Sequence, residues 1–510
     1  MIAKVNSCGL VGLDGYIVEV EIDISMGMPT FDIVGLPDAA VKESRERVRA
    51  AVKNSGFVFP SRRIIINLAP AHIKKEGSVY DLPMAVAFLM ATNQIQIENV
   101  DDFVFIGELS LDGQVRAVSG VLPMVIAARE NGAKCALVPY ENASEAAVVK
   151  GIDIIGVNTL TQLCDHISGR THIDAHTIDL DEYFKKQNEC GIDFSEVKGQ
   201  ENVKRALEIA AAGNHNILMI GSPGSGKSMI AQRLPTILPD MTFEEALEVT
   251  KIHSIAGTLS SDAPIITNRP FRHPHHTISA IGLSGGGRVP KPGEVSLAHN
   301  GVLFLDELPE FNKDALEVMR QPLEDGSVTI ARINATLTYP CNVMFVASMN
   351  PCRCGYYGDG SGRCKCTESQ VAQYLGKVSG PLLDRIDLHI EVAPVKYKDL
   401  ENESPTESSS EIKKRVNAAR KIQSERYKDY NIYSNSQLTP AMINIFCGLG
   451  EQERAIIKGA FDRLGLSARA YNRILKVSRT IADLDESENI LSKHIAEAIQ
   501  YRSLDRKFWS

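Results

Sequence analysis

The chain has 510 residues, of which 44% are hydrophobic and 23% charged, and its formal net charge is −8. This composition excludes a disordered chain and indicates a globular protein of about three domains. The acidic balance argues against a surface coated by nucleic acid, although it permits a local basic channel. Because the first residues lack a signal-peptide pattern and no apolar run is of spanning length, we expect a cytoplasmic protein with no membrane partner.

The pattern of apolar residues divides the chain into blocks. Residues 1–168 alternate β-branched runs such as YIVEVEIDI with helical patterns, which predicts an α/β or α+β domain. A polar linker is expected at 169–193. In 194–395 the short apolar strands NILMI, GVLFLDE and NVMFVASMN alternate with helices, which predicts a parallel sheet with a site at its carboxyl edge. A second linker at 396–411 precedes a helical block, 412–510, so we expect a multidomain α/β protein with an all-α C-terminal part.

The segment GSPGSGKS follows the strand NILMI directly and opens a helical pattern. This context is typical of a phosphate-binding loop, in which backbone N–H groups and a helix N-terminus surround the β-phosphate of a nucleotide. Lys227 would reach β- and γ-phosphate oxygens and the Ser228 hydroxyl would ligate Mg²⁺, so ATP and Mg²⁺ are the expected cofactors. The alternative is a flexible glycine-rich turn. The predicted nucleotide-binding residues are Gly221, Ser222, Pro223, Gly224, Ser225, Gly226, Lys227 and Ser228.

The insert at 271–293 is basic and glycine-rich, as a loop that touches the phosphates of nucleic acid needs to be. An ordered structural loop is an equal alternative, and the clustered histidines also suggest metal, although no second ligand cluster accompanies them. A β-hairpin is predicted over 326–343. The residues that we single out for nucleic-acid contact are Arg272, His273, His275, His276, Arg288 and Lys291 in the insert and Arg332 near the hairpin tip.

The strand GVLFLDE ends in Asp306 and Glu307, downstream of the phosphate loop. Asp306 could join the Mg²⁺ shell, and Glu307 could act as general base on the attacking water. An isolated Asp-Glu pair is more often a solvated strand end, but its place after a phosphate loop favours ATP hydrolysis. The next strand ends in Asn350, which could orient the same water or could merely start the Asn-Pro turn.

Four of the ten cysteines lie in the loop 350–366 as two CxC pairs around a Gly-rich turn, namely Cys352, Cys354, Cys364 and Cys366. Four thiolates at this spacing could close a tetrahedral Zn²⁺ site. CxC is tighter than the usual CxxC, and the alternatives are two redox pairs or reduced thiols without metal. Because the loop follows Asn350, a metal there could brace the end of the strand.

Two arginines complete the set of candidates. Arg385 precedes a β-pattern in GPLLDRIDLHIEV and could reach the γ-phosphate of a neighbouring subunit, where a guanidinium offsets transition-state charge. Arg469 shares one predicted helical face with Arg473 and Lys476, at i, i+4 and i+7. For that face a solvated basic stripe is an equal alternative.

Together these motifs resemble the ComM/YifB family of magnesium-chelatase-like AAA+ ATPases over essentially the whole chain. The resemblance lies in FSEVKGQENVKRALEIAAAGNHNILMIGSPGSGKSMIAQRLPTILP, in RPFRHPHHTISAIGLSGGGRVPKPGEVSLAHNGVLFLDELPEF and in SGPLLDRIDLHIEV. It implies an AAA+ core and a homohexameric ring in which Lys227, Asp306, Glu307 and Asn350 act within one subunit. Arg385 would be the arginine finger that acts in the neighbouring subunit, and Arg469 the sensor of the C-terminal lid. Ser222 is a departure, because this loop position commonly carries proline.

The same resemblance implies ATP-driven translocation on single-stranded or branched DNA, of the helicase or branch-migration kind, in DNA uptake during transformation or in recombination. In related rings a hairpin such as the one at 326–343 lines the pore. Two alternatives stay open, namely a chelatase-type ATPase that remodels a protein partner and a ring that binds ATP only to hold an assembly together. Stimulation of ATP hydrolysis by DNA separates the DNA motor from the protein remodeller.

Residues 1–168 resemble the Lon-protease-like domain of this family, which has a ribosomal-protein-like α+β fold. In an ungapped alignment Val79 falls at the position of the Lon serine nucleophile and Leu122 at that of its lysine. Neither side chain can act as nucleophile or base. Ser78 is one residue away, with its nearest lysines on the same segment, so we expect no peptidase activity and a scaffold or nucleic-acid contact role instead.

Overall fold

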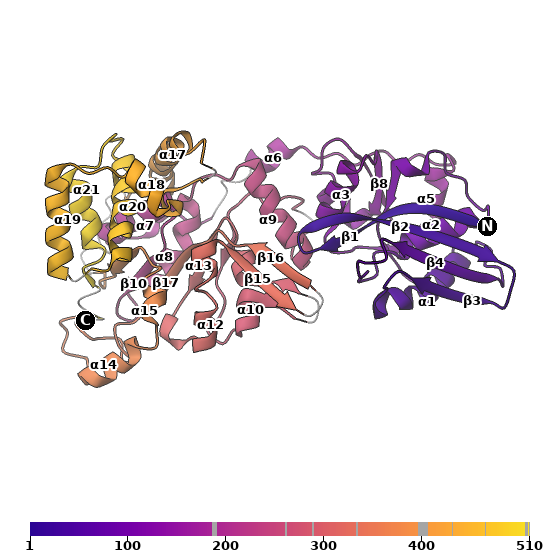
Figure 1. Cartoon of the computed structure of the whole chain (residues 1–510). Helices are drawn as coiled ribbons and strands as arrows, with labels where there is room; N and C mark the ends of the chain where they lie inside the picture. Colours follow the sequence, from indigo (N-terminus) through magenta and orange to yellow (C-terminus); the bar gives the residue numbers. More distant parts are fainter. Residues whose placement is uncertain are drawn as a thin grey trace. The chain divides into compact units, whose positions relative to one another are not determined.

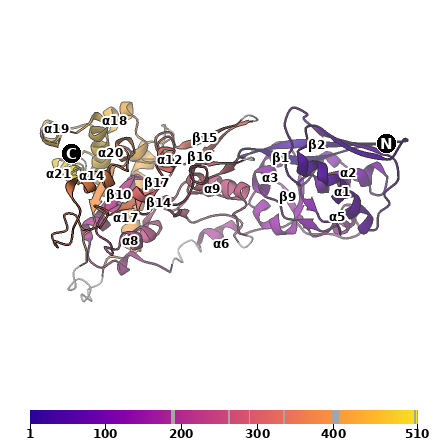
Figure 2. The same cartoon turned by 90° about the horizontal axis from the view of Figure 1, so that it is seen from below.

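The structure is a computed structural model that describes residues 1–185, 191–260, 263–287, 290–332, 335–395, 406–430, 432–464, 466–504 and 508 (Figures 1 and 2). The chain forms two compact units. The first comprises Met1–Lys185 and Ala246–Thr267, and the second comprises Lys186–Glu245 and Asn268–Ser510. Within the described residues, no helix is both long and apolar enough to pass through a membrane.

The first unit contains a large mixed sheet and a set of helices. Its strands are β1 (Ile2–Val11), β2 (Asp14–Ser25), β3 (Thr30–Val34), β4 (Arg63–Ala69), β5 (Phe103–Phe105), β8 (Cys135–Pro139) and β9 (Asp153–Val157), with a small pair, β6 (Glu108–Leu109) and β7 (Val115–Arg116). Its helices are α1 (Ala39–Asn54), α2 (Asp81–Ala91), α3 (Val121–Glu130), α4 (Ala143–Ala146), α5 (Leu160–Ile167), α6 (Leu180–Lys185) and most of α9 (Phe243–Ala256).

The sheet of this unit has seven strands in the order β3-β4-β2-β1-β5-β8-β9. β1 and β2 form a long antiparallel hairpin, in which the apolar residues of β2 alternate and every second one from Val18 to Ile24 is buried. α2 is apolar and packs against both strands of this hairpin, with nearly all of its residues buried. It is therefore the centre of the core of the first unit.

The helix α9 joins the first unit from a distant part of the chain. The hydroxyl of Ser254 on this helix donates to the buried carboxylate of Glu145, and its carbonyl oxygen accepts from the Gly120 N–H at 3.1 Å. Burial raises the pKa of Glu145, while the bonds from Ser254 and from the Leu122 backbone oppose this shift. The segment 246–267 thus clusters with residues 1–185, although its neighbours in sequence belong to the second unit.

The second unit is built on a parallel sheet of five strands. These are β10 (Ile217–Ile220), β11 (Phe271–Arg272), β14 (Val302–Leu305), β17 (Met344–Met349) and β18 (Leu388–Glu391), in the order β11-β14-β17-β10-β18. Every residue of β10, β14 and β17 is buried, as their continuous apolar sequences predict for strands covered on both faces. The carboxyl ends of these three neighbouring strands therefore meet at one edge of the sheet.

Shorter elements surround this sheet. The helices are α7 (Glu201–Gly213), α8 (Lys227–Arg233), α10 (Ala280–Ser284), α11 (Glu294–Leu297), α12 (Lys313–Glu317), α13 (Pro322–Asp325), α14 (Glu368–Leu375) and α15 (Gly380–Leu383), and the added strands are β12 (Gly285–Gly286), β13 (Lys291–Pro292), β15 (Ser327–Arg332) and β16 (Ala335–Pro340). The hairpin expected over 326–343 is present, since β15 pairs antiparallel with β16. Both views show it as a separate two-stranded ribbon (Figures 1 and 2).

The C-terminal part of the second unit is helical in its described residues. Its helices are α17 (Ser409–Arg426), α18 (Pro440–Phe446), α19 (Glu451–Leu464), α20 (Ala468–Leu484) and α21 (Ser492–Gln500). Their apolar faces belong to the same core cluster as β10, α7 and α8. These features confirm the prediction of a multidomain α/β chain with a parallel-sheet core and a helical C-terminal region.

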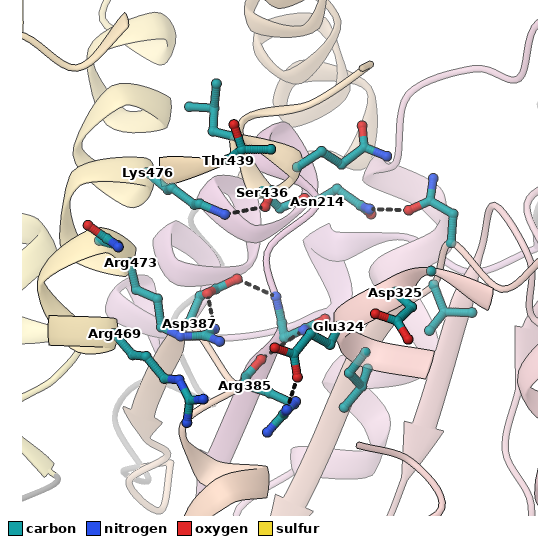
Figure 3. Close-up of a pocket in the computed structure, with 18 of the residues that line it drawn as sticks. Asn214, Glu324, Asp325, Arg385, Asp387, Ser436, Thr439, Arg469, Arg473 and Lys476 are labelled. Atoms are coloured by element: carbon teal, nitrogen blue, oxygen red, sulfur yellow. Dashed lines mark hydrogen bonds and ion pairs between the residues drawn. The ribbon is translucent and has the colours of Figure 1, made fainter. Parts of the chain in front are cut away.

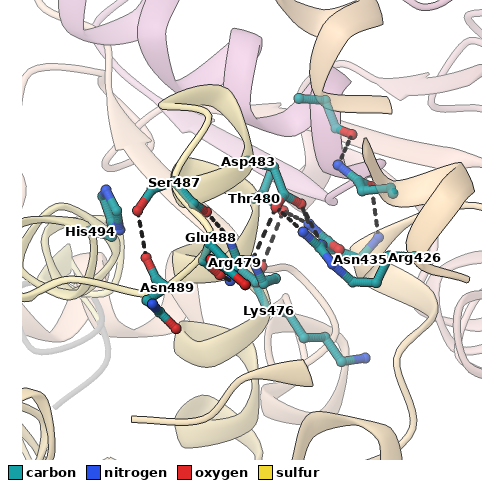
Figure 4. A network of polar contacts seen from close by, with 12 residues as sticks. Arg426, Asn435, Lys476, Arg479, Thr480, Asp483, Ser487, Glu488, Asn489 and His494 are labelled. Carbon is teal, nitrogen blue, oxygen red and sulfur yellow. Dashed lines mark hydrogen bonds and ion pairs between the residues drawn. The ribbon is translucent and has the colours of Figure 1, made fainter. Parts of the chain in front are cut away.

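A buried polar network ties the C-terminal helices together (Figure 4). The carboxylate of Asp483 on α20 is fully buried and accepts two bonds from Arg426 on α17, at 2.6 and 2.9 Å. It also accepts from Arg479 at 3.0 Å and from Asn435 at 2.9 Å. Because a buried charge is tolerated only when it is paired, this carboxylate fixes α17 and α20 against each other.

Candidate active site

The phosphate loop connects β10 to α8 at the carboxyl edge of the parallel sheet. Gly226, the N-cap of α8, has a φ of 88°, which favours glycine. A Cβ atom at Gly221 would lie 2.4 Å from the carbonyl oxygen of Val392, so this position has no room for a side chain. The sequence therefore folds here into a compact glycine loop that leads directly into a helix N-terminus, which is an arrangement that binds anions.

Lys227 is the buried cation of this loop. Its ammonium group donates to the carbonyl oxygens of Gly221 and Ser222 at 2.8 and 3.0 Å and to Oδ1 of Asn350 at 3.2 Å. Burial lowers the pKa of Lys227, and the charges of Asp306 and Glu307 oppose that shift. The structure thus brings together the phosphate loop and Asn350 at the end of β17.

Asp306 lies directly after β14 and accepts hydrogen bonds from a residue of α8 and from a residue of β17. The Ser228 hydroxyl donates to its Oδ2 at 2.5 Å, and the Ser348 hydroxyl donates to its Oδ1. Ser348 was not among the predicted site residues. Leu305 on β14 pairs with Ala347 on β17 in the parallel register, so the residues that follow them, Asp306 and Ser348, lie side by side. This strand register is the signal by which Ser348 can be recognised as a neighbour of Asp306.

Glu307 follows Asp306 in an unusual backbone conformation. Its φ of 56° places it in the left-handed region, which is uncommon for a residue with a side chain and is found at functional sites. Its side chain is 56% exposed, and its Oε2 lies 3.7 Å from Nδ1 of His276. The two carboxylates therefore differ in environment, because Asp306 is bonded to Ser228 and Glu307 is open to solvent.

These residues line a cavity of about 370 Å³. Its lining is Pro223 to Met229, Asp306, Glu307, Ser348, Met349 and Asn350. A phosphate chain with Mg²⁺ suits this donor set, because the loop N–H groups and the Lys227 ammonium are phosphate donors, and the Ser228 hydroxyl and Asp306 carboxylate are hard oxygen ligands only 2.5 Å apart. The residues present fit a bound magnesium nucleotide.

Gln200 is a further residue that sequence reasoning missed. It has a φ of 59°, and its side-chain amide donates to the carbonyl oxygens of Ser225 in the phosphate loop and of Ala393 after β18, at 2.9 and 3.0 Å. It therefore joins the loop to the end of the neighbouring strand. No local sequence signal distinguishes this glutamine from a surface residue.

The predicted arginines lie at the other edge of the sheet, around a second cavity of about 550 Å³ (Figure 3). Arg385 donates to Glu324 and to the Pro381 carbonyl oxygen at 2.8 Å, and its own carbonyl accepts from Asn216, which precedes β10. Arg469 lies 3.7 Å from Asp384 and its side chain is 62% exposed. The structure brings Arg385 and Arg469 together at the amino edge, whereas Lys227 lies at the carboxyl edge.

The charged side chains around this second cavity shift one another's pKa values. Burial lowers the pKa of Arg385, and the nearby charges of Arg320, Arg469 and Arg473 lower it further. Asp387, which precedes β18, is buried and pairs with Arg473. Although burial alone would raise the pKa of Asp387, the charge of Arg473 and the hydrogen bond to His215 hold it well below its usual range.

The candidates for nucleic-acid contact take several environments. Arg272 forms a two-bond ion pair with Glu294 at 2.6 and 2.7 Å, and the His273 ring lies 4.8 Å from that of Phe304. His275 contacts Thr277, and its ring lies tilted against that of His276 with 4.1 Å between the ring centres. Lys291 is exposed on β13, and Arg332 ends β15 with its side chain outside the described part. Arg288 lies outside the described residues.

The four cysteines of the loop 350–366 converge. Their sulfur atoms all lie within 4.8 Å of one another, and none is in a disulfide.

In the first unit, Val79 and Leu122 are buried, and the Ser78 hydroxyl donates to Glu108. The buried Lys75 ammonium donates to the carbonyl oxygens of Pro70 and Ile73, whereas the Ser78 hydroxyl is bonded to Glu108.

Comparison with known families matches nearly all parts of the chain. The family described as "Magnesium chelatase, subunit ChlI" matches residues 193–400, which include the whole carboxyl-edge cavity. "Subunit ChlI of Mg-chelatase" matches residues 20–142, and "Magnesium chelatase, subunit ChlI C-terminal" matches residues 406–502.

Similar proteins align over the full length. The chain is 41% identical to "Competence protein ComM" of Haemophilus influenzae over 509 residues, which are 99% of this chain and 98% of that protein. It is 42% identical to YifB of Escherichia coli over 504 residues, 98% of this chain and 97% of that protein. A shorter match of 35% identity over 129 residues relates 25% of this chain to 22% of "Lon protease 2" of Bacillus subtilis.

Proposed function

This chain belongs to the ComM/YifB family of magnesium-chelatase-like AAA+ ATPases, and we propose that it is an ATP-hydrolysing ring motor that moves on single-stranded or branched DNA. The observation that carries the ATPase is the convergence of Lys227, Asp306 and Asn350 on one cavity at the carboxyl edge of a parallel sheet. ATP hydrolysis would power helicase or branch-migration activity in DNA uptake or recombination.

The residues at the carboxyl edge divide the work of hydrolysis. Bound MgATP supplies the phosphoanhydride bond and a metal that offsets charge on the phosphate oxygens. Lys227 and the loop N–H groups hold the phosphates, while Ser228 and Asp306 offer the two oxygens suited to Mg²⁺. Glu307, open to solvent, would take a proton from the attacking water, and Asn350 would orient that water.

The position of the arginines supports a ring. Arg385 and Arg469 lie at the amino edge, so they cannot serve the site at the carboxyl edge of the same sheet unless the chain rearranges. Packing one subunit's amino edge against the next subunit's nucleotide would give both guanidinium groups a γ-phosphate partner. We infer a homohexamer in which Arg385 is the arginine finger and Arg469, the lid sensor, acts from the same face.

Three features support a DNA partner. A full-length relative is named a competence protein. The insert 271–293 carries an exposed lysine and a group of histidines, and the hairpin of β15 and β16 forms a separate ribbon suited to a pore. The Lon-like block, 1–168, would serve as a scaffold or a nucleic-acid contact without peptidase activity, because buried Val79 and Leu122 occupy the positions of the serine and lysine.

The deciding experiment is ATP turnover by the purified chain, with Lys227→Ala beside it, in the presence of single-stranded, duplex or four-way-junction DNA at a fixed salt concentration. We expect turnover that DNA stimulates and that Lys227→Ala abolishes. Turnover that no DNA changes would reject the DNA motor and favour a chelatase-type ATPase that remodels a protein partner.

A further inference from the structure

The loop between β17 and α14 carries four sulfur atoms in one small volume. Sγ of Cys352 lies 3.3 Å from that of Cys354 and 3.9 Å from that of Cys364, and the Cys354 and Cys364 sulfurs are 3.6 Å apart. Disulfide-bonded sulfurs would lie about 2.05 Å apart. Four thiolates around one Zn²⁺, at about 2.3 Å from the metal, would lie about 3.8 Å from one another. The separations among Cys352, Cys354 and Cys364 lie near the second geometry, and the Cys366 sulfur lies within 4.8 Å of all three.

The backbone around these sulfurs donates hydrogen bonds to them. The N–H groups of Tyr356 and Lys365 donate to Cys354, the N–H of Cys366 donates to Cys364, and the N–H of Cys354 donates to Cys366. Such bonds offset the negative charge that thiolates leave around a divalent ion and fix their orientation. Exposed cations also alternate with the ligands in sequence, at Arg353, Arg363 and Lys365.

From this geometry we propose that Cys352, Cys354, Cys364 and Cys366 bind one structural Zn²⁺. All four ligands come from the protein, so the site is closed and offers no open coordination position for catalysis. A single ion accounts for four sulfurs within 4.8 Å of one another, whereas a cluster of several iron ions would spread its ligands further.

The loop 350–366, which carries the four cysteines, contacts the nucleotide site at two points. Cys352 is buried only two residues after Asn350, and the Asn350 N–H donates to the hydroxyl of Tyr374 on α14, the helix that begins just after Cys366. On the other side, a Cβ atom at Gly355 would lie 2.4 Å from Cδ of Pro223 in the phosphate loop. A metal bound by the four cysteines would therefore hold the loop that runs from Asn350 to α14. Both ends of this loop contact Asn350, and its turn at Gly355 packs on the phosphate loop.

The first test is metal content, which does not depend on ATP turnover or on DNA. The full-length chain, purified from zinc-supplemented cells without chelators or oxidants, is expected to contain about one Zn²⁺ per chain by inductively coupled plasma mass spectrometry. Cys364→Ser combined with Cys366→Ser should lower that content at least about tenfold, while Cys135→Ser in the first unit should leave it unchanged. Metal-free wild type, iron in place of zinc, or full zinc in the double variant would overturn the proposal.

A second pair of variants separates ligation from folding. Histidine also binds zinc in tetrahedral sites, so Cys366→His should retain more zinc than Cys366→Ser, and equal content in the two would argue against direct ligation. Gly355→Ala should weaken the binding of a fluorescent ATP analogue about tenfold, because its Cβ would displace Pro223 and because the φ of 88° at this position strains any side chain. Unchanged nucleotide affinity in Gly355→Ala would disprove the contact between the loop 350–366 and the phosphate loop as a functional one.

Discussion

The ammonium of Lys227 donates to the side-chain oxygen of Asn350 at 3.2 Å, so a side-chain hydrogen bond joins the phosphate loop to the residue that follows β17. The backbone of Asn350 is also positioned, because its N–H donates to the hydroxyl of Tyr374. The side-chain bond from Lys227 and the backbone bond to Tyr374 together fix Asn350 before any nucleotide arrives, which is the condition under which a polar group stabilises a transition state efficiently.

Asn350→Ala is therefore expected to lower kcat for ATP hydrolysis about 10²-fold, because one preorganised polar group is lost. ATP affinity should stay within about threefold of wild type, since the loop N–H groups and Lys227 remain. Turnover and nucleotide binding measured separately give the answer, with Asn54→Ala on the surface of α1 as the matched control. A loss of affinity as large as that of Lys227→Ala would mean that Asn350 only supports the loop.

Arg385 offers a test of the ring that needs no structure of the assembly. Arg385→Ala and Lys227→Ala should each lack ATP hydrolysis when alone, because one lacks the finger and the other the phosphate contact. When the two are mixed, some neighbours combine an intact nucleotide site with an intact arginine, so hydrolysis should return in part. Titration of one variant into the other, followed by phosphate release, measures this effect. Mixtures as inactive as the separate variants would place Arg385 in its own subunit's site.

His276 was predicted to contact nucleic acid, but the structure places it 3.7 Å from the carboxylate of Glu307. We expect His276→Ala to lower ATP turnover about tenfold even without DNA, because the candidate general base loses its neighbour. His172, which lies 3.5 Å from Asp174 in the first unit and is exposed, gives a control of the same chemistry. If His276→Ala hydrolyses ATP normally without DNA but binds DNA more weakly, His276 contacts nucleic acid and does not assist Glu307.

The local parts of the site were predictable because their signals are local. A glycine-rich loop between an apolar strand and a helix, and polar residues at the ends of parallel strands, indicated Lys227, Asp306 and Asn350 before the fold was known. Contacts between distant segments left no such trace. Nothing in the sequence of α9 shows that Ser254 bonds to Glu145, and the motif containing Arg272 does not reveal its ion pair with Glu294.

The same limit applies to the two arginines. Their motifs suggested phosphate contact, but only the topology shows that both belong to the edge of the sheet opposite Lys227. Strand order depends on interactions across the whole unit, whereas a motif records only its neighbours. The fold class was therefore accessible from the sequence, and the relation between the nucleotide cavity and the arginine cavity was not.

Asp387 allows a prediction of pH dependence. Its pKa in the folded chain lies well below the usual range, because Arg473 and His215 outweigh the effect of burial. A depressed carboxyl pKa stabilises the fold at every pH above the unfolded value of about 3.9, and this contribution is lost only as pH falls below that value toward the folded pKa. Between pH 7 and pH 5 the contribution should therefore be constant.

Asp387→Asn should destabilise the second unit by about 3–5 kcal/mol, because it leaves the partly buried Arg473 without a counter-charge. The difference in unfolding free energy between wild type and variant should be the same at pH 7 and pH 5, and should shrink only below about pH 4. Denaturant unfolding followed through hydrogen exchange of α20 and β18 measures it in the relevant unit. Asp384→Asn, which removes the exposed partner of Arg469, should change stability by less than about 1 kcal/mol. If the difference instead rises between pH 7 and pH 5, the Asp387 carboxyl binds its proton more tightly in the folded chain than in the unfolded chain, and Arg473 does not hold it ionised.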